Sequence, residues 1–441
     1  MDSMDAVGKR TISTLKWHLM PFAFLLYVVN IVDRGNLAYA ALDMNKALHI
    51  TGTAFGVLLS VFFISYFLCE VPSNMALHRY GARRWMARIM VSWGLVTCCM
   101  FFVRTFVHIS ILRFLLGAAE AGFFPGMVFY FTLWFPAKQR AWAVSVFMLA
   151  IPVSMILSGP LSTWIMGNIH WLSQAGWRWL FLLEGSISVL VGVATFFYLT
   201  DKPEDAKWLD EKQKEWLRME MAKEATPKEA SRHLSVKKTL AHPRIWRLAL
   251  IYFTMQMTTQ IAGFWLPMLI KEFSKTFTNM AVGWLSMAMS IVAAIAMVLW
   301  GWHSDAKNER KYHAAIPMLL SVIGLAMAAF SDNLIVKIIG LTINGAGNVM
   351  YVGPFWSLPA IFLTAEAAAV GMAMINSMSS LGGFIGSNVT GLLKDSRYGA
   401  SGLLAFQAFC CLVAFALTIS LRKRDLGVST STEGAGVAAA K

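Results

Sequence analysis

Two stretches decide the fold, namely Asn74–Arg84 (NMALHRYGARR) and Gly301–Lys311 (GWHSDAKNERK). Each follows an apolar run and has a small or polar opening residue, a polar centre and a cluster of basic residues. They stand at equivalent points, after the second apolar run of each half of the chain. Such weak internal symmetry between two six-helix halves is typical of one class of secondary transporters, whose substrate site lies at the membrane midplane between the halves.

The rest of the chain contains apolar runs long enough to cross a bilayer, which takes about 20 predominantly apolar residues. Twelve such runs lie near residues 18–42, 53–77, 85–105, 108–134, 140–167 and 177–200, and near 244–270, 280–302, 313–331, 333–362, 368–393 and 400–421. We therefore predict an all-α integral membrane protein with twelve transmembrane helices in two six-helix halves.

The hydrophilic segments divide the chain into an N-terminal half (1–200), a cytoplasmic central loop (201–242), a C-terminal half (243–421) and a cytoplasmic tail (422–441). Within the central loop, apolar residues recur at helical spacing, which indicates an amphipathic helix on the membrane surface. A solvated linker that joins the halves is the alternative, and we favour it. The recurring residues are Trp208, Leu209, Trp216 and Leu217.

Composition supports a membrane protein, since 57% of the 441 residues are hydrophobic and only 14% are charged, against about 25% in soluble proteins. The net charge of +14 does not indicate nucleic-acid binding, because the basic residues lie in short bursts between apolar runs. The five cysteines lie in apolar runs without a CxxC or Cys/His cluster, so we expect no metal, no cofactor and no disulfide framework.

The distribution of Lys and Arg predicts the orientation, because cytoplasmic loops carry an excess of these residues. The basic bursts fall in the loops that are inside if the N-terminus is inside. We therefore expect a monomeric, multi-pass protein of the cell (inner) membrane with both termini in the cytoplasm. The basic residues of these loops are Arg79, Arg83, Arg84, Arg88, Lys138, Arg140, Lys307, Arg310, Lys311, Arg422, Lys423 and Arg424.

The two opening stretches resemble the inside-loop signature of the major facilitator superfamily, which has a Gly, an acidic–basic pair and further basic residues. Gly301 and Asp305 match this signature, whereas Asn74 and His78 replace the Gly and the Asp of the first copy. In the family this Asp helps to latch one conformational state. The resemblance thus implies a weaker or pH-sensitive first latch, and gating roles for His78, Arg79, Asp305 and Arg310.

Four longer stretches resemble the anion:cation symporter family, and within it the bacterial branch that carries phthalate, tartrate and hydroxyphenylacetate-type acids. These stretches are VDRGNLAYAAL (32–42), YFLCEVPSNMALHRYGARRW (66–85), RFLLGAAEAGFFPG (113–126) and GWRWLFLLEG (176–185). Close relatives within this branch carry different acids, so the resemblance implies a class of substrate and not one compound.

Four charged residues lie inside the predicted spans of the first half. Asp33 and Arg34 interrupt the first span, and a charge near a bilayer centre costs several kcal/mol, about 2.5–3.5 on insertion scales. Arg113 and Glu120 are seven residues apart on the fourth span, so they share one helix face about 10 Å apart. The second half offers polar but uncharged residues, namely Gln256, Gln260, Asn344, Asn348, Tyr351, Ser357 and Asn376.

This asymmetry predicts a division of labour between the halves. A carboxylate in a low-dielectric cavity can take up a proton near neutral pH, so Asp33 and Glu120 are the expected proton carriers. An Arg presents a charged fork to a carboxylate, so Arg34 and Arg113 are expected to bind the substrate or to hold the acids. Amides and hydroxyls of the second half, among them Gln256, Asn344 and Asn348, are expected to bind the uncharged end of the solute.

The family resemblance agrees with this division at the matching positions. It implies roles for Asp33, Arg34, Arg113 and Glu120, and it adds Tyr66 on the second helix, Ser357 on the tenth and Asn376 on the eleventh. A Gln that sugar-acid members use on the fifth helix has no counterpart near Ile151, which weighs against a polyhydroxy substrate.

Structural roles are the alternatives for several of these residues. Asp33 and Arg34 could form a packing cluster with Arg113, and Glu120 could serve only as the partner of Arg113. Tyr66 could simply be lodged between helices. Two further acids are assigned away from the site, because Glu70 fits the cytoplasmic gate and Glu184 fits a structural pair with Arg178 near an outside end.

We therefore predict a secondary active transporter that imports a small organic anion (a mono- or dicarboxylate) together with protons by alternating access. Its partners are the anion, protons and the lipid bilayer. Coupling to sodium, exchange, transport of a sugar acid and a transporter-like solute sensor are the alternatives. We do not expect an enzyme, because the sequence contains no GxSxG, HExxH or P-loop motif.

Overall fold

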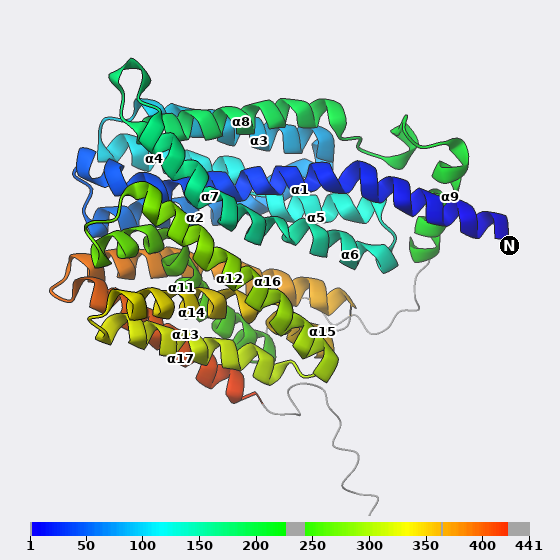
Figure 1. The fold of residues 1–441 in the computed structure, drawn as a ribbon. Coiled ribbons are helices and arrows are strands. Elements are labelled where there is room, and N and C mark those ends of the chain that lie inside the picture. The colour runs from blue at the N-terminus through cyan, green and yellow to red at the C-terminus, as the bar shows by residue number, and fades with distance from the viewer. Residues whose placement is uncertain (1, 226–242, 363–364, 422–441) are drawn as a thin grey trace, which may run out of the picture. The chain divides into compact units, whose positions relative to one another are not determined.

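The computed structural model describes residues 2–225, 243–362 and 365–421, and every regular element in them is a helix (Figure 1). This confirms the predicted all-α class. The first helices are α1 (Asp2–Ala47), α2 (Gly52–Tyr80), α3 (Ala82–Cys99), α4 (Phe106–Glu120), α5 (Phe123–Trp134), α6 (Ala137–Met148), α7 (Ala150–Asn168), α8 (Gly176–Tyr198) and α9 (Glu211–Ala225). The later ones are α11 (Pro243–Phe273), α12 (Asn279–Lys307), α13 (Lys311–Phe330), α14 (Leu334–Met350), α15 (Val352–Phe362), α16 (Ala365–Asp395) and α17 (Gly399–Ile419).

Ten segments of the described residues are long and apolar enough to cross a membrane. Three of them contain a break between consecutive helices, namely α4 and α5, α6 and α7, and α14 and α15. Two further helices, α11 and α16, have 31 residues each. A helix of that length extends about 46 Å, more than the roughly 30 Å of a bilayer's hydrocarbon core. Together these segments make the twelve spans that the sequence predicts.

The helices form two compact units, which we call unit 1 (Met1–Ser231 with Phe264–Ala288) and unit 2 (Arg232–Gly263 with Met289–Lys441). The segment Phe264–Ala288 contains the end of α11 and the beginning of α12, and it packs on α1 and α2 within unit 1. Asn279 donates a hydrogen bond of 2.8 Å to Asp43. The rings of Phe55 and Trp265 meet edge to face with centroids 5.2 Å apart.

Glycine residues allow the helices of unit 1 to approach closely. A Cβ on Gly94 of α3 would lie 2.7 Å from the carbonyl oxygen of Gly185 of α8, and these two helices run side by side (Figure 1). A Cβ on Gly117 of α4 would lie 2.3 Å from the carbonyl oxygen of Phe62 on α2. Small residues at helix contacts are typical of membrane proteins, because they let backbones pack against each other. The contact at Gly117 holds α4, which carries Arg113 and Glu120, against α2.

Replacing Gly117 by Ala is expected to destabilise the protein, because α2 and α4 must separate to admit the methyl group. Overpacking of this kind costs about 1–3 kcal/mol. The matched control is Gly167→Ala on α7, where a Cβ would meet nothing within 4 Å and where Ala is favoured over Gly by about 0.5–1 kcal/mol. Thermal unfolding of both variants in detergent tests this prediction. Equal midpoints for the two variants would contradict the tight contact.

A left-handed glycine, Gly122, lies two residues after the predicted proton carrier Glu120. Gly122 has φ +89° and separates α4, which ends at Glu120, from α5, which begins at Phe123. Only Gly adopts this conformation without strain. A Cβ there would also lie 2.5 Å from the Ser73 hydroxyl oxygen. The break therefore places Glu120 at a helix end inside the span and not in the middle of a continuous helix.

The central segment differs from the solvated linker that we favoured, because residues 201–225 pack on unit 1. Leu209 and Leu217 are buried. The Trp208 ring stacks on His18 of α1 and on Trp134 of α5, with centroid distances of 4.0 and 5.2 Å. Burial of these apolar side chains against protein explains why the helical spacing exists. Residues 226–242 and the tail 422–441, for which we expected loop and tail, lie outside the described residues.

Candidate transport site

Glu120 and Arg34 form a buried ion pair between α4 and α1. The Nε atom of Arg34 donates to Oε1 of Glu120, and the same oxygen accepts a hydrogen bond of 2.5 Å from Asn30. The side chain of Glu120 is 3% exposed, whereas that of Arg34 is 33% exposed. The carboxylate is therefore shielded from solvent, while part of the Arg34 side chain remains exposed.

Asp33 is buried one position earlier on α1 but binds only neutral donors. Its Oδ1 accepts a hydrogen bond of 3.0 Å from Asn36, and its Oδ2 accepts one of 3.0 Å from Thr97 on α3. It interacts electrostatically with Glu120 and Arg113, so the structure brings these predicted charges into one cluster. Hydrogen bonds from neutral groups stabilise the ionised form less than a direct ion pair does.

Arg113 is 2% exposed, yet it makes no ion pair with any described residue, and its Nε has no hydrogen-bond partner there. Its guanidinium carbon lies 4.7 Å from the centroid of the Phe62 ring. A packing role for Glu120 as the partner of Arg113 was the structural alternative for this acid. In the structure Glu120 pairs with Arg34 instead, and Arg113 interacts with the acids only at longer range.

Tyr66 of α2 completes the cluster on the side of Arg34. Its hydroxyl hydrogen-bonds Arg34, and its ring centroid lies 5.2 Å from the guanidinium carbon. The ring of Phe62, one turn earlier on α2, lies 5.5 Å from the same carbon. The two rings of α2 therefore both lie against the Arg34 guanidinium.

In unit 2, the two predicted asparagines are engaged with each other and with their neighbours. Asn348 donates from Nδ2 to Oδ1 of Asn344 at 2.9 Å and accepts at Oδ1 from the Thr258 hydroxyl at 2.7 Å. Gln407 of α17 donates to the carbonyl oxygen of Thr258 at 3.1 Å. Asn344 and Asn348 are both 3% exposed. This network joins α11, α14 and α17 within unit 2.

The other predicted polar residues of unit 2 are half-buried. Neither Gln256 of α11 nor Asn376 of α16 hydrogen-bonds any described residue, so both amides are available to a solute. Ser357 of α15 donates to the carbonyl oxygen of Gly353 at 3.1 Å, which leaves its lone pairs as acceptors. The amides of Gln256 and Asn376 thus have no partner among the described residues, whereas those of Asn344 and Asn348 do.

The first inside-loop stretch is bound by an acid from outside it, Asp201, which comparing the two stretches does not reveal. His78 and Arg79 are exposed, and the His78 ring packs against Phe129 at a centroid distance of 4.2 Å. The N-terminus of α3 is instead bound by Asp201, whose Oδ1 accepts a hydrogen bond of 2.8 Å from the backbone of Arg83. A carboxylate is favourable at a helix N-terminus. Asp201 therefore supplies a negative charge at this helix N-terminus, which the His78 side chain cannot supply.

The second inside-loop stretch pairs its two predicted gating residues, because Arg310 donates to Asp305 at 2.5 Å. Next to this pair, Glu309 accepts hydrogen bonds from the backbones of Tyr312 and His313 at the beginning of α13 and from the His313 ring at 2.7 Å. The His313 ring also meets that of His303, with 2.8 Å between nitrogens. Burial opposes the ionisation of Glu309, but these hydrogen bonds outweigh it and lower its pKa.

This lowered pKa predicts a pH-dependent stabilisation of unit 2. The contribution of ionised Glu309 is fully present above its ordinary pKa of 4.5 and is lost as the pH falls through the lowered value. We expect Glu309→Gln to destabilise the protein at pH 7 by about 0.3–1 kcal/mol, the usual effect of a charge at a helix N-terminus. Melting curves in detergent at decreasing pH measure it, with the exposed Glu204→Gln as control. A difference from wild type that persists unchanged in acid would refute the charge effect.

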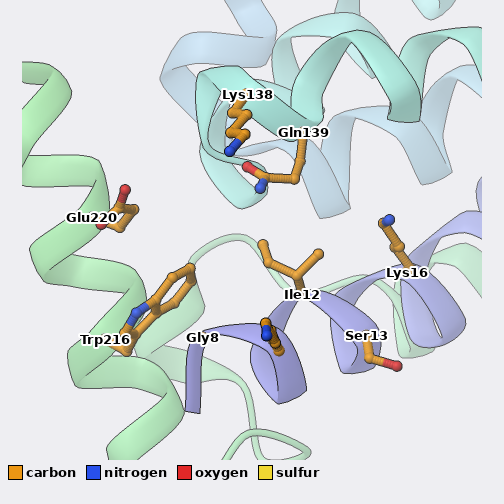
Figure 2. Close-up of a pocket in the computed structure, with 9 residues that line it drawn as sticks. Gly8, Ile12, Ser13, Lys16, Lys138, Gln139, Trp216 and Glu220 are labelled. Carbon is orange, nitrogen blue, oxygen red and sulfur yellow. The ribbon is translucent and has the colours of Figure 1, made fainter. Parts of the chain in front are cut away.

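A separate hollow of about 570 Å³ lies where the beginning of α1 meets α6 and α9 (Figure 2). It contains none of the predicted substrate or proton residues, and three lysines give it a basic character. We therefore distinguish it from the buried charge cluster. Its lining consists of Gly8, Lys9, Ile12, Ser13, Lys16, Lys138, Gln139, Trp216 and Glu220.

Sequence reasoning missed the neutral residues that hold the acids, namely Asn30, Asn36 and Thr97. It also missed Gln407, which binds the carbonyl oxygen of Thr258 in unit 2. A signal for the first two was present, because Asn30 and Asn36 stand three residues on either side of Asp33 and therefore on its helix face. Thr97 and Gln407 come from helices distant in sequence, and no local pattern indicates them. Within the described residues no group of His, Cys, Asp and Glu could hold a metal ion.

Comparison with known proteins now gives the family. The model of the Major Facilitator Superfamily matches residues 23–387. A protein of Agrobacterium vitis, provisionally named a tartrate transporter, is 42% identical, with 94% of this chain and 95% of the relative aligned. A protein of Pseudomonas putida, provisionally named the metabolite transport protein NicT, is 36% identical over 95% and 96% of the two chains.

A solved bacterial homologue of the human lysosomal transporter Spinster has the same fold at 16% identity, with a TM-score of 0.77 over 93% of this chain and 97% of that one. These findings confirm the family that the loop signature and the four longer motifs indicate, and they make this protein a multi-pass membrane transporter rather than an enzyme. The chain belongs to the major facilitator superfamily.

Proposed function

We propose that this protein is a symporter that carries a small organic anion, a mono- or dicarboxylate, into the cell together with protons. The observation that carries the proposal is that Arg34 pairs with Glu120 while a third of the Arg34 side chain remains exposed. One guanidinium therefore has two possible carboxylate partners, the internal acid and the substrate. Competition between the two can couple the substrate to a proton.

The coupling follows from the charge of Glu120. When Glu120 is ionised, it holds Arg34, and a substrate carboxylate meets a neutral pair. When Glu120 takes up a proton, the ion pair ends and the fork of Arg34 can bind the substrate carboxylate in two places. The net charge of the cluster is then the same before and after loading, which avoids the high free energy of an extra buried charge.

Asp33 and Arg113 support a second exchange of the same kind. Among the described residues, Asp33 has no direct cation and Arg113 has no direct carboxylate, so the two balance each other only through space. Protonation of Asp33 leaves Arg113 as an uncompensated cation and favours the entry of an anion. We assign proton binding to both Asp33 and Glu120, and substrate binding to Arg34, Arg113 and Tyr66.

The chemistry of the solute follows from the available donors. Arg34 and Arg113 favour one or two carboxylates, and the amides of Gln256 and Asn376, with the hydroxyl of Ser357, suit a hydroxyl or carbonyl group. We place Asn344 and Asn348 in a supporting role for this half-site, because their amides already have partners. A relative provisionally named a tartrate transporter makes tartrate the first acid to test.

Uptake into proteoliposomes that contain the purified chain tests this proposal. A panel of tartrate, phthalate, hydroxyphenylacetate and a sugar acid is added outside, and the external pH and the internal solute are recorded together. We expect external alkalinisation with at least one of the first three acids. Uptake of labelled acid without any proton movement would contradict symport and would instead indicate sodium coupling, exchange or facilitated diffusion. Binding of an acid without flux would indicate a solute sensor.

A further inference from the structure

A third carboxyl group, that of Glu184 on α8, is buried in unit 1 without a basic partner. Glu184 is 3% exposed, and its Oε1 accepts a hydrogen bond of 3.2 Å from the Ser162 hydroxyl on α7. Its Oε2 has no hydrogen-bond partner among the described residues. Arg178, which sequence reasoning pairs with it, donates instead to the carbonyl oxygen of Phe101 at 2.5 Å. The predicted structural pair is therefore absent from the described part of the chain.

Glu184 belongs to the same polar network as Asp33. Asn36 hydrogen-bonds Asp33 at 3.0 Å and is also a side-chain partner of Glu184, and the two acids interact electrostatically. Tyr39 is the other titratable group of α1 near Glu184. From α3, Cys98 contacts the hydroxyl of Ser186, two residues after the acid on α8.

The remaining element packed here, α7, contributes the uncharged Ser162. No Lys, Arg or His of the described residues forms an ion pair with Glu184. Two neighbouring carboxyl groups repel each other when both are ionised, and an ion without a counter-charge inside a membrane costs several kcal/mol, about 2.5–3.5 on insertion scales. The Asp33–Glu184 pair therefore favours a state that holds at least one proton.

The acids lie at two depths. Glu184 is 8 residues after the beginning of α8 and thus about 12 Å from that helix end, whereas Asp33 is 14 residues, or about 21 Å, before the end of α1. Glu120, 14 residues after the beginning of α4, is also about 21 Å from its helix end. The sequence predicts that all three helix ends are outside. Glu184 is thus the acid nearest to the predicted outer side.

We propose that Glu184 is a third proton-binding site of this transporter, which takes up a proton from the outer side and shares it with Asp33. The transfer moves one proton from the carboxyl of Glu184 to the carboxylate of Asp33, with no other bond formed or broken. Asn36 holds the two groups in one network, and Ser162 positions the outer one. This inference rests on the proposed proton symport.

A matched set of variants tests it. Glu184→Gln and Glu184→Met remove the acid, Glu184→Asp keeps an acid there, and Ser162→Ala removes only the hydrogen bond. Gln removes the charge that disfavours ionisation of Asp33, so the pH at which uptake is half-maximal is expected to fall by about one unit, the size of coupling between neighbouring carboxyl groups. Solute exchange at equal pH on both sides is expected to continue, and Glu184→Asp is expected to restore the wild-type profile. Glu184→Met provides the same test if the Glu184→Gln variant does not fold.

Infrared difference spectroscopy separates this inference from the proposed symport, since it needs no transport. A carboxylic-acid carbonyl band that responds to pH in the wild type and is missing in Glu184→Gln supports the site. An unchanged band together with an unchanged pH profile of uptake overturns it. If the wild-type protein moves no protons with any acid, the symport fails, whereas the band still reports whether Glu184 binds a proton.

Discussion

Replacing Glu120 by Gln is expected to abolish uphill accumulation of the substrate driven by a proton gradient. Gln cannot bind or release a proton, and it cannot form an ion pair with Arg34. The guanidinium is then permanently free for a substrate carboxylate, so substrate binding is expected to persist and to depend less on pH, with the remaining dependence due to Asp33. Exchange of labelled for unlabelled substrate across the membrane, which needs no net proton movement, is expected to continue.

Proteoliposomes with an imposed pH gradient and, separately, with equal pH and internal unlabelled substrate measure these two activities. The control is Glu204→Gln, the same change at an exposed acid outside the predicted spans, which is expected to behave as wild type. Gradient-driven accumulation that survives in Glu120→Gln would remove Glu120 from the coupling mechanism.

Replacing Arg34 by Lys is the second change with a large expected effect. Lys keeps the positive charge but loses the planar fork that holds a carboxylate in two places. Hydrogen bonds to charged groups contribute about 1.5–3 kcal/mol, which corresponds to a 10- to 100-fold rise in KM. The same change at Arg113 is expected to raise KM less, because that guanidinium is buried and interacts with the acids only at longer range.

Initial rates of uptake for the two Lys variants, at a pH where Glu120 of the wild type is loaded with a proton, measure this difference. A larger loss in Arg113→Lys than in Arg34→Lys would reverse the assigned roles. Equal and small losses would indicate that neither fork binds the substrate carboxylate.

The fold could be predicted because its signals are local. Apolar runs of about 20 residues and the repeat at Asn74 and Gly301 are readable in the chain itself, and bilayer thickness fixes their meaning. The helix break after Glu120 is harder to predict from the sequence, although Gly122 marks its position. An apolar run does not reveal whether its backbone is one helix or two.

The sequence predicts which residues belong to the charge cluster, but it does not predict which of them form ion pairs. A buried charge in a span is rare enough to identify Asp33, Arg34, Arg113 and Glu120 one by one. Which acid meets which base depends on how α4 packs on its neighbours, where Gly117 allows a close approach to α2. Spacing along one helix therefore suggested Arg113 for Glu120, whereas the tertiary structure supplies Arg34.

Glu184 is another residue whose partners could not be predicted from its position in the sequence. Its neighbour Arg178 on α8 offered a local partner, but that guanidinium binds the carbonyl oxygen of Phe101 at the helix end. The partners of Glu184 come from α7 and α1. Pairing by sequence distance alone thus concealed a buried acid without a cation.

Proton uptake on substrate binding tests the central claim most directly. Calorimetric titration of the purified protein with the acid identified by the transport panel, in two buffers of different ionisation enthalpy, gives the protons taken up per bound solute. The exchange of partners at Arg34 predicts net proton uptake in the wild type and a clear loss of it in Glu120→Gln, with binding retained. Substrate binding without proton uptake, or the same uptake in both proteins, would contradict it.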